Sequence, residues 1–338
     1  MKVLFIGGTG NLSTACTRRA LAKNMEVFHL NRGTRQGRTP PGVTELRGDI
    51  RNPAEVGKAL GGLRFDSVVQ FLAFSPEHIE ADMEMFQGIT GQYVFISSAS
   101  VYKRPSLHPV ITEATPLENP YWDYAQLKIA CEETLTRKGR EKGFPYTIIR
   151  PSHTYDDGWI LSQFVSVDFG VAWRMLSGLE VVAAGDGQSV WTVTHASDFA
   201  KGLVGLLGNP AALGEAFHIT SDEFLTWNAI LTMIGAALGV KPKIAHIPSE
   251  FIMRVLPHRG VGLLGDKGHS CIFDNSKIRR FVPGFRPEIH FAEGIRRSID
   301  WYNARPELKV PNQTLNAEFD KLLDCWNKAL ALAETLKA

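Results

Sequence analysis

Short β-branched runs that alternate with longer amphipathic stretches constrain the fold of this sequence most. Six such runs precede residue 151, at 2–6, 26–30, 44–48, 67–73, 93–97 and 146–150. Between them apolar residues recur at helical spacing, as at Leu12, Cys16 and Ala20. Strands that alternate with helices form parallel sheets joined by right-handed crossovers and covered by helices. We therefore predict an α/β fold with a doubly wound parallel sheet of the Rossmann type.

A glycine-rich turn follows the first predicted strand immediately. It reads Gly7-Gly8-Thr9-Gly10, and Asn11 and Leu12 open the next amphipathic stretch. Glycines let the backbone approach a pyrophosphate, and the free N–H groups of a helix N-terminus point at it. The turn and its position predict a dinucleotide-binding site.

The second half of the chain has a looser pattern. A strand is expected at 216–219 and helices at 226–238, 290–304 and 315–337, the last two separated by a connector with Pro306 and Pro311. A length of 338 residues allows two parts. We predict a dinucleotide-binding Rossmann domain over 1–155, to which 188–240 returns. A smaller mixed α/β substrate-binding domain would contain 156–187 and 241–338.

Composition names no macromolecular partner. The 37 Lys and Arg residues nearly balance the 35 Asp and Glu residues, so no basic field would gather nucleic acid or anionic lipid. The four cysteines form no CxxC pair or Cys/His cluster, so we expect no metal site and buried thiols in a reducing compartment. The apolar run after Lys2 is too short for a signal peptide or membrane span, which predicts a cytoplasmic protein.

The residues after the second strand bear on the choice of dinucleotide. Sheets of this type that bind NAD usually carry an acidic residue there for the ribose 2′-hydroxyl. This chain has Asn31, Arg32 and Arg35 instead. Guanidinium groups favour a 2′-phosphate, so we predict that NADP(H) is preferred and NAD(H) is possible. Alternatively, the two arginines are solvated loop charges.

A tyrosine and a lysine supply the candidate chemistry. Tyr124 and Lys128 are four residues apart and therefore share a helix face, where an ammonium group can lower the pKa of a phenol. A tyrosine tuned in this way is a general acid or base. Ser98 follows the fifth strand at the carboxyl edge of the sheet, where ligands bind in such folds. We predict Ser98, Tyr124 and Lys128 as catalytic residues.

These motifs, together with Gly48-Asp49-Ile50, FLAF at 71–74, SSASVY at 97–102 and IRPSHTY at 149–155, resemble the extended (or atypical extended-like) short-chain dehydrogenases/reductases of the NAD-dependent epimerase/dehydratase family. The resemblance implies that Tyr124 exchanges a proton, that Lys128 holds the nicotinamide ribose and that Ser98 binds the reacting oxygen. It also implies a homodimer. Further cofactor contacts would be Asp49 and Ile50 at the adenine, with Leu72, Ala73, Phe74, Pro151 and His153 lining the cofactor.

Three departures from the family pattern narrow the substrate. Ala99 and Ser100 stand where 4,6-dehydratases carry an Asp-Glu pair, and Trp191 stands where nucleotide-sugar epimerases have a phosphate-binding arginine. A second family arginine is replaced near 263–264, and Arg259 could substitute only if its loop shifts. A diphosphate would be poorly neutralised, so we expect a sugar-like alcohol or ketone without one. The predicted substrate contacts are Ser98, Ser100, His153, Tyr155 and Trp191. Trp191 could equally be a core residue.

Three functions follow from these observations. The leading one is an NAD(P)-dependent oxidoreductase acting on a small molecule. The second is a sugar or nucleotide-sugar epimerase that retains its cofactor. The third is a non-catalytic RNA-binding or regulatory relative, since some divergent members with a similar Asn-Arg-Gly turn are described in this way. The intact Ser98, Tyr124 and Lys128 and the near-neutral charge argue against the third.

Overall fold

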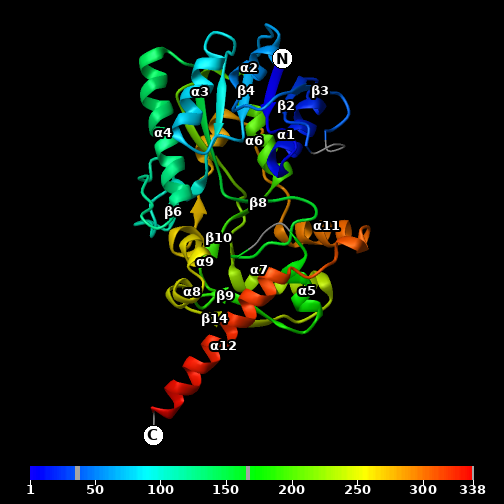
Figure 1. Cartoon of the computed structure of the whole chain (residues 1–338), viewed down its shortest axis with the longest axis vertical. Coiled ribbons are helices and arrows are strands. Elements are labelled where there is room, and N and C mark those ends of the chain that lie inside the picture. Colours follow the sequence, from blue (N-terminus) through cyan, green and yellow to red (C-terminus); the bar gives the residue numbers. More distant parts are fainter. Residues whose placement is uncertain (35–38, 165–167, 337–338) are drawn as a thin grey trace.

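The computed structural model describes residues 1–34, 39–164 and 168–336. A seven-stranded parallel sheet with its helices forms one half, and helices with short strand pairs form the other (Figure 1). All seven predicted strands belong to this sheet, in the order β12-β7-β5-β4-β1-β2-β3. Their bounds are β1 Lys2–Ile6, β2 Glu26–Asn31, β3 Val43–Arg47, β4 Ser67–Gln70, β5 Tyr93–Ile96, β7 Tyr146–Pro151 and β12 Ala216–Ile219.

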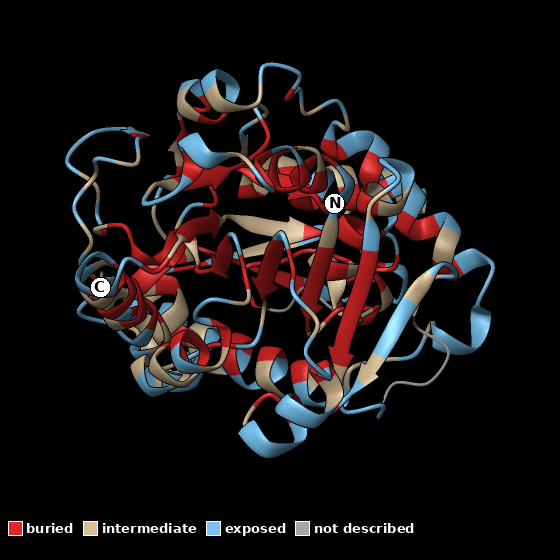
Figure 2. Ribbon diagram, turned by 90° about the horizontal axis from the view of Figure 1, so that it is seen from above, coloured by how far each residue is buried: buried red, intermediate tan, exposed pale blue. Residues whose placement is uncertain are grey.

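The alternation of apolar side chains along β1 explains the helical layers on both faces of the sheet. Val3 and Phe5 pack with one face, against α1 (Asn11–Ala22) and α6 (Ala196–Leu206). Leu4 and Ile6 pack with the other, against α2 (Pro53–Leu60), α3 (Pro76–Phe86) and α4 (Asp123–Lys142). The central strands are consequently buried (Figure 2). This is the predicted doubly wound α/β arrangement.

The order of the strands fixes where a ligand can bind. From β1 the chain builds β2 and β3 on one side and then returns to add β4 on the other. The two windings separate at the carboxyl ends of β1 and β4, where ligands bind in open α/β sheets. The Gly7 to Gly10 turn and Leu72 lie there.

The second half joins segments that are far apart in the sequence. Its four strand pairs are β6 Val110–Ile111 with β15 Ile272–Phe273, β8 His153–Tyr155 with β11 Val193–His195, β9 Glu180–Ala184 with β14 Lys243–Ile247, and β10 Val190–Trp191 with β13 Leu225–Thr226. Its helices are α5 Gly170–Leu176, α7 Trp227–Leu238, α8 Ser249–Val255, α9 Pro257–Gly262, α11 Phe291–Asn303 and α12 Gln313–Thr335, with a π-helical segment over Leu263–Lys267. α7, α11 and α12 correspond to the three helices expected from the sequence.

Packing divides the chain differently from the predicted boundaries. Trp227, Ile230 and Ile234 of α7 lie in the core of the second half, although we had assigned 188–240 to the Rossmann domain. Conversely, α10 (Ser276–Phe281) packs on β12 and places Ile278 in the core of the sheet half. We therefore propose that α7 belongs with the substrate side and α10 with the sheet.

Two further expectations concern cysteines and membranes. All four cysteines are unpaired; Cys16, Cys131 and Cys271 are buried and Cys325 is partly exposed. Within the described ranges, no helix combines the length and apolarity needed to cross a membrane. The last turns of α12 extend away from the body of the molecule (Figure 1).

Candidate active site

The glycine turn has no room for side chains on the sheet side. Gly7 has φ +83, and a Cβ on it would lie 2.7 Å from Leu72 Cγ. A Cβ on Gly8 would lie 2.4 Å from the ring of the buried His29. Ser13 stands where the G-x-G-x-x-G motif has its third glycine. It accepts a hydrogen bond from Gly10 N–H and donates one to the Gly7 carbonyl, both 2.8 Å long. Ser13 therefore closes the turn.

A pocket of about 380 Å³ opens beside this turn, and we call it the dinucleotide pocket. Of the predicted cofactor residues, it is lined by Gly7, Thr9, Gly10, Asn31, Arg32, Asp49, Ile50, Leu72 and Phe74. Asn11 and Leu12 begin α1 directly behind the turn. Arg35 lies outside the described residues. Arg51 belongs to no motif and was not predicted. It also lines the pocket and donates a hydrogen bond of 2.6 Å to the Leu72 carbonyl.

Ser98, Tyr124 and Lys128 come together at the carboxyl edge of β5. Tyr124 hydrogen bonds with Ser98, and the Lys128 ammonium lies 5.9 Å from the centre of the Tyr124 ring. Lys128 is buried and donates to the carbonyls of Ala73 at 2.7 Å and Ile96 at 2.9 Å. An ammonium group has three donors, so one remains for a ligand or for Tyr124. Ala73 therefore contributes a carbonyl to Lys128, in addition to its predicted place near the cofactor.

The pKa values of these groups reflect their burial. Burial raises the pKa of Tyr124, and the hydrogen bond with Ser98 acts in the opposite direction. This shift is opposite to the lowering that we predicted from Lys128. Burial also lowers the pKa of Lys128 from 10.5 to about 8, so this group titrates near neutral pH.

A second pocket of about 320 Å³ is lined by Ser98 and Tyr124, and we call it the indole pocket. Three tryptophans supply flat apolar surface to it: Trp122, Trp159 and Trp191. The other lining residues are Ser98, Ala99, Ser100, Tyr124, Pro151, Ser152, His153, Thr154, Asp266, Lys267 and Cys271. Pro151 and His153, predicted at the cofactor, therefore lie in this pocket. Its volume is at the small end of the roughly 300–1,000 Å³ of small-molecule sites.

Two of the predicted substrate residues have a core environment. Trp191 stacks on Trp227 with ring centres 5.8 Å apart, so it is both a core residue and a wall of the indole pocket. The structure does not bear out Tyr155 as a substrate contact. This residue is 1 % exposed, packs against His195 and Phe291, and does not line the pocket. Tyr155 shares a face of β8 with His153, but His195 and α11, through Phe291 and Gly294, cover its ring.

Arg259 does not replace the missing family arginine. Its guanidinium binds Glu318 on α12 at 2.9 Å and the Phe164 carbonyl at 3.1 Å, and it does not line the indole pocket. Lys267 is the cationic residue that lines this pocket. Sequence patterns could not identify Lys267 or Asp266, because both lie in the irregular Leu263–Lys267 segment without a motif.

Asn119 links the walls of the indole pocket. Its side-chain amide donates to the carbonyls of Ser100 at 2.9 Å and Gly265 at 2.7 Å. Its carbonyl oxygen accepts from the N–H groups of Tyr121 and Trp122 at the start of α4. A single buried side chain thus ties together the Ser98 loop, the helix of Tyr124 and the segment of Lys267.

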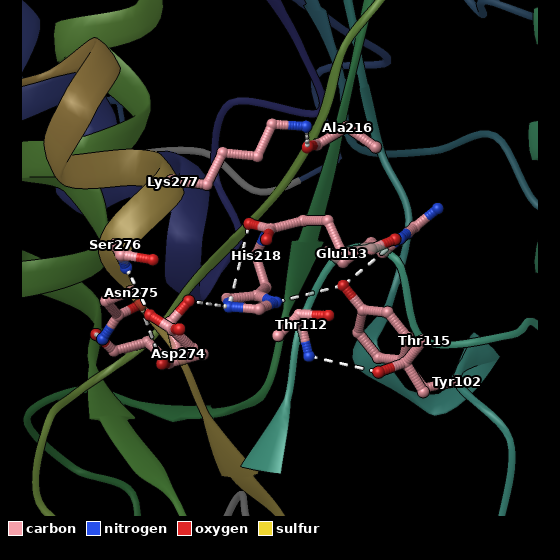
Figure 3. Close-up of polar contacts among 12 residues, drawn as sticks. Tyr102, Thr112, Glu113, Thr115, Ala216, His218, Asp274, Asn275, Ser276 and Lys277 are labelled. Atoms are coloured by element: carbon pink, nitrogen blue, oxygen red, sulfur yellow. Dashed lines mark hydrogen bonds and ion pairs between the residues drawn. The ribbon is translucent and has the colours of Figure 1, made fainter.

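A buried polar network surrounds Tyr102, which directly follows the turn after Ser98 (Figure 3). Arg150 Nη1 donates to the Tyr102 hydroxyl at 3.2 Å, and this hydroxyl lies 3.0 Å from His218 Nδ1. His218 Nε2 lies 2.8 Å from the Asp274 carbonyl. A guanidinium can only donate, so the Tyr102 proton points to Nδ1 and the imidazole proton sits on Nε2. His218 is therefore neutral, consistent with the lowering of its pKa by burial.

Asp156, Asp157 and His195 form an additional acidic cluster, with ligand atoms within 4.8 Å of one another. Ser197 N–H donates to His195 Nδ1, so the neutral ring carries its proton on Nε2. Nε2 faces Asp157 at 3.6 Å and Asp156 at 3.8 Å. At these distances Nε2 forms no hydrogen bond with either carboxylate.

The glycine turn, the parallel sheet and the Ser98, Tyr124 and Lys128 group define a dinucleotide-dependent enzyme of the Rossmann class. Residues 3–220 match the sequence profile of the NAD dependent epimerase/dehydratase family, and the chain belongs to this family. The family assignment confirms the resemblance seen in the sequence motifs.

Individual relatives differ in activity. The chain is 24 % identical over 286 residues to 2'-dehydrokanamycin reductase from Streptomyces kanamyceticus, covering 85 % of this chain and 80 % of that protein. It is 24 % identical over 321 residues to chloroplast stem-loop binding protein of 41 kDa b from Arabidopsis thaliana, covering 89 % and 78 %. The structure of UDP-glucose 4-epimerase from Bifidobacterium longum with NAD+ and UDP superimposes with a TM-score of 0.70 at 21 % identity, covering 90 % and 99 %.

Proposed function

We propose that the protein is an NADP(H)-preferring oxidoreductase that transfers hydride at a sugar-like alcohol or ketone. The observation that carries the proposal is a link between the two pockets. Ser98 and Tyr124 line the indole pocket, and the Lys128 ammonium lies 4.7 Å from the ring centre of Phe74, which lines the dinucleotide pocket. One pocket has a glycine turn suited to a pyrophosphate and the other has flat apolar walls suited to a ring.

The dinucleotide pocket fits its expected ligand. Gly7 and Gly8 let the turn pack tightly on Leu72 and His29, which holds the start of α1 at the pocket, and Asn11 has a buried carbonyl oxygen without a partner in the described chain. Gly7, Thr9, Gly10 and the N-terminus of α1 would hold the pyrophosphate, with Asp49 and Ile50 at the adenine. When bound, the dinucleotide supplies or accepts the hydride.

The side chains of the protein would transfer the proton that accompanies the hydride. Reduction leaves the substrate oxygen in need of a proton, which the Tyr124 phenol donates, and oxidation reverses this transfer. Ser98 would hydrogen bond to the same oxygen and orient it. Lys128 has one donor left beside two backbone carbonyls, and it would orient the cofactor ribose and stabilise the Tyr124 phenolate.

The preference for NADP(H) rests on cations beside the dinucleotide pocket. Arg32, Arg47 and Lys58 line a second hollow that adjoins the first through Arg32, Gly48 and Asp49. The Arg32 side chain is 68 % exposed and lies 4.0 Å from Asp49, so it is free to turn toward a phosphate. A 2′-phosphate would meet guanidinium groups there. The test is a titration of the protein with NADPH and NADH; equal or tighter binding of NADH would refute this preference.

The decisive experiment is Tyr124→Phe. We expect turnover to fall by orders of magnitude while the Kd of the dinucleotide stays unchanged, because only the proton-transfer group is lost. Tyr121→Phe is the matched control, since Tyr121 is 45 % exposed and near the same helix. Full activity of Tyr124→Phe would remove Tyr124 from the mechanism. Light scattering tests the further expectation of a homodimer, and fractionation tests that of a cytoplasmic location.

Two other functions have specific tests. An epimerase would interconvert substrates without net consumption of dinucleotide, whereas the proposed reaction oxidises or reduces one equivalent per turnover. The relative named as a stem-loop binding protein suggests RNA binding as the third candidate. Submicromolar binding of a stem-loop RNA at physiological salt, unchanged in Tyr124→Phe, would favour that function over the enzyme.

A further inference from the structure

Lys267 places one ammonium group inside the indole pocket. Its Nζ lies 5.2 Å from the centre of the Trp122 ring. Burial lowers the pKa of His153 and raises that of Asp266, and the charge of Lys267 acts downward on both. Trp122, His153 and Asp266 come from three separate segments and all line the pocket. The ammonium group is therefore within electrostatic reach of several pocket walls.

The charge of Lys267 is not neutralised by a close ion pair. The neighbouring Asp266 carboxylate lies 3.7 Å from Arg104 Nη2, a guanidinium whose side chain is fully buried behind the pocket. Within the described part of the chain, no carboxylate forms an ion pair with Lys267 itself. Arg104, Lys267 and Asp266 together are two basic groups and one acidic group, and burial holds the pKa of His153 well below its usual value. The pocket thus carries about one net positive charge.

A single ammonium group selects one kind of anion. A diphosphate carries several charges and is usually bound by planar guanidinium groups. Among the residues that the structure describes, no arginine lines the indole pocket. One carboxylate would match the one ammonium group, and the indole faces would contact the apolar face of a sugar ring.

We propose that the substrate is a sugar acid, with a single carboxylate bound by Lys267 and its ring packed on Trp122, Trp159 and Trp191. This inference rests on the proposed function, because it places the reacting carbon beside Ser98 and Tyr124. It distinguishes the substrate from the nucleotide sugars and from neutral or aminated sugars. Lys267 is then the residue that determines specificity.

The test compares three ligands of matched size in the NADP+-saturated protein. Methyl glucuronide, methyl glucoside and the methyl glycoside of glucosamine are titrated while tryptophan fluorescence is followed. We expect the glucuronide to bind roughly tenfold more tightly than the other two, because it alone forms a charge-assisted hydrogen bond with Lys267. Lys267→Met should abolish this preference and Lys267→Arg should retain it. The backbone carbonyl of Lys267, which accepts hydrogen bonds from Gln163 and Trp227, is unchanged in both variants.

Lys103→Met is the matched control, because Lys103 forms its ion pair with Glu118 and does not line the pocket. Three results would overturn the inference: equal or tighter binding of the neutral or aminated glycoside, an unchanged preference in Lys267→Met, or no binding of any of the three. Failure of the proposed function has a separate signature, since it would appear as a lack of dinucleotide binding. Normal dinucleotide binding without a carboxylate preference would refute only the sugar-acid substrate.

Discussion

Replacing Arg150 by methionine is a sharp test of the buried network under the active site. Arg150 Nε lies 3.0 and 3.1 Å from the two Glu132 oxygens, and Nη2 lies 2.6 Å from one of them. The two side chains are only 6 % and 3 % exposed. Arg150→Met would leave the Glu132 carboxylate buried without a counter-charge, which typically costs about 3–5 kcal/mol. Against a total stability of roughly 5–15 kcal/mol for a domain, such a loss is large.

The sign of the pH dependence follows from the isolated carboxyl group. In the variant, burial without a counter-charge favours the uncharged form of this carboxyl group in the folded state. The folded variant then binds more protons than the unfolded one, so its free energy of unfolding increases as the pH falls. The deficit relative to the native protein should therefore shrink between pH 7 and pH 5.

Urea denaturation followed by circular dichroism at pH 7 and pH 5.5 measures both effects. The control is the double variant Arg150→Met with Glu132→Leu, which removes both charges and should recover much of the stability. A loss below about 1 kcal/mol at pH 7, where ordinary substitutions lie, would refute the reasoning. A double variant as unstable as the single one would also refute it.

Three more predictions concern the site. Gly8→Ala should cost about 1–3 kcal/mol and weaken dinucleotide binding, because its Cβ would meet the His29 ring at 2.4 Å; normal Tm and Kd would show that the turn can shift freely. Lys128 takes up a proton on unfolding at any pH between its folded pKa of about 8 and its unfolded pKa near 10.5. The free energy of unfolding should therefore rise with pH over this range, and denaturant titrations of Lys128→Met should not show the rise. Tyr102→Phe should lower kcat several-fold with unchanged KM, because it loosens the Ser98 loop. Tyr146→Phe removes a buried hydroxyl elsewhere and should leave kcat unchanged. Equal effects of the two substitutions on kcat would argue for a general loss of packing.

Local patterns were sufficient to predict the sheet half. The strands run through the core, so their β-branched residues form continuous apolar runs that are visible without tertiary information. The run at 67–73 is an exception, because β4 ends at Gln70. Gln70 turns its side chain back to accept a hydrogen bond from Leu72 N–H, which starts the loop early.

The substrate side could be predicted only in part. Ser98, Ser100, His153 and Trp191 lie within recognisable motifs, and all four line the indole pocket. Lys267 enters that pocket through a π-helical segment whose position depends on the distant Asn119. Contacts between residues that are 146 positions apart leave no periodic signal. Tyr155 was misplaced because it shares a strand face with His153, and the residues that cover it, His195 and Phe291, are distant in the sequence.

The strand pair of Val110–Ile111 with Ile272–Phe273 has a consequence for how the molecule forms during translation. Strands β1 to β7 are synthesised first and can associate as soon as they leave the ribosome, since domains tend to fold from the N-terminus. The partner of Val110 and Ile111 is made some 160 residues later, together with Asp266, Lys267 and Cys271. Nascent chains released before this point would have the glycine turn and Tyr124 but an incomplete substrate wall. Each newly synthesised molecule should therefore be able to bind its cofactor before it can bind its substrate.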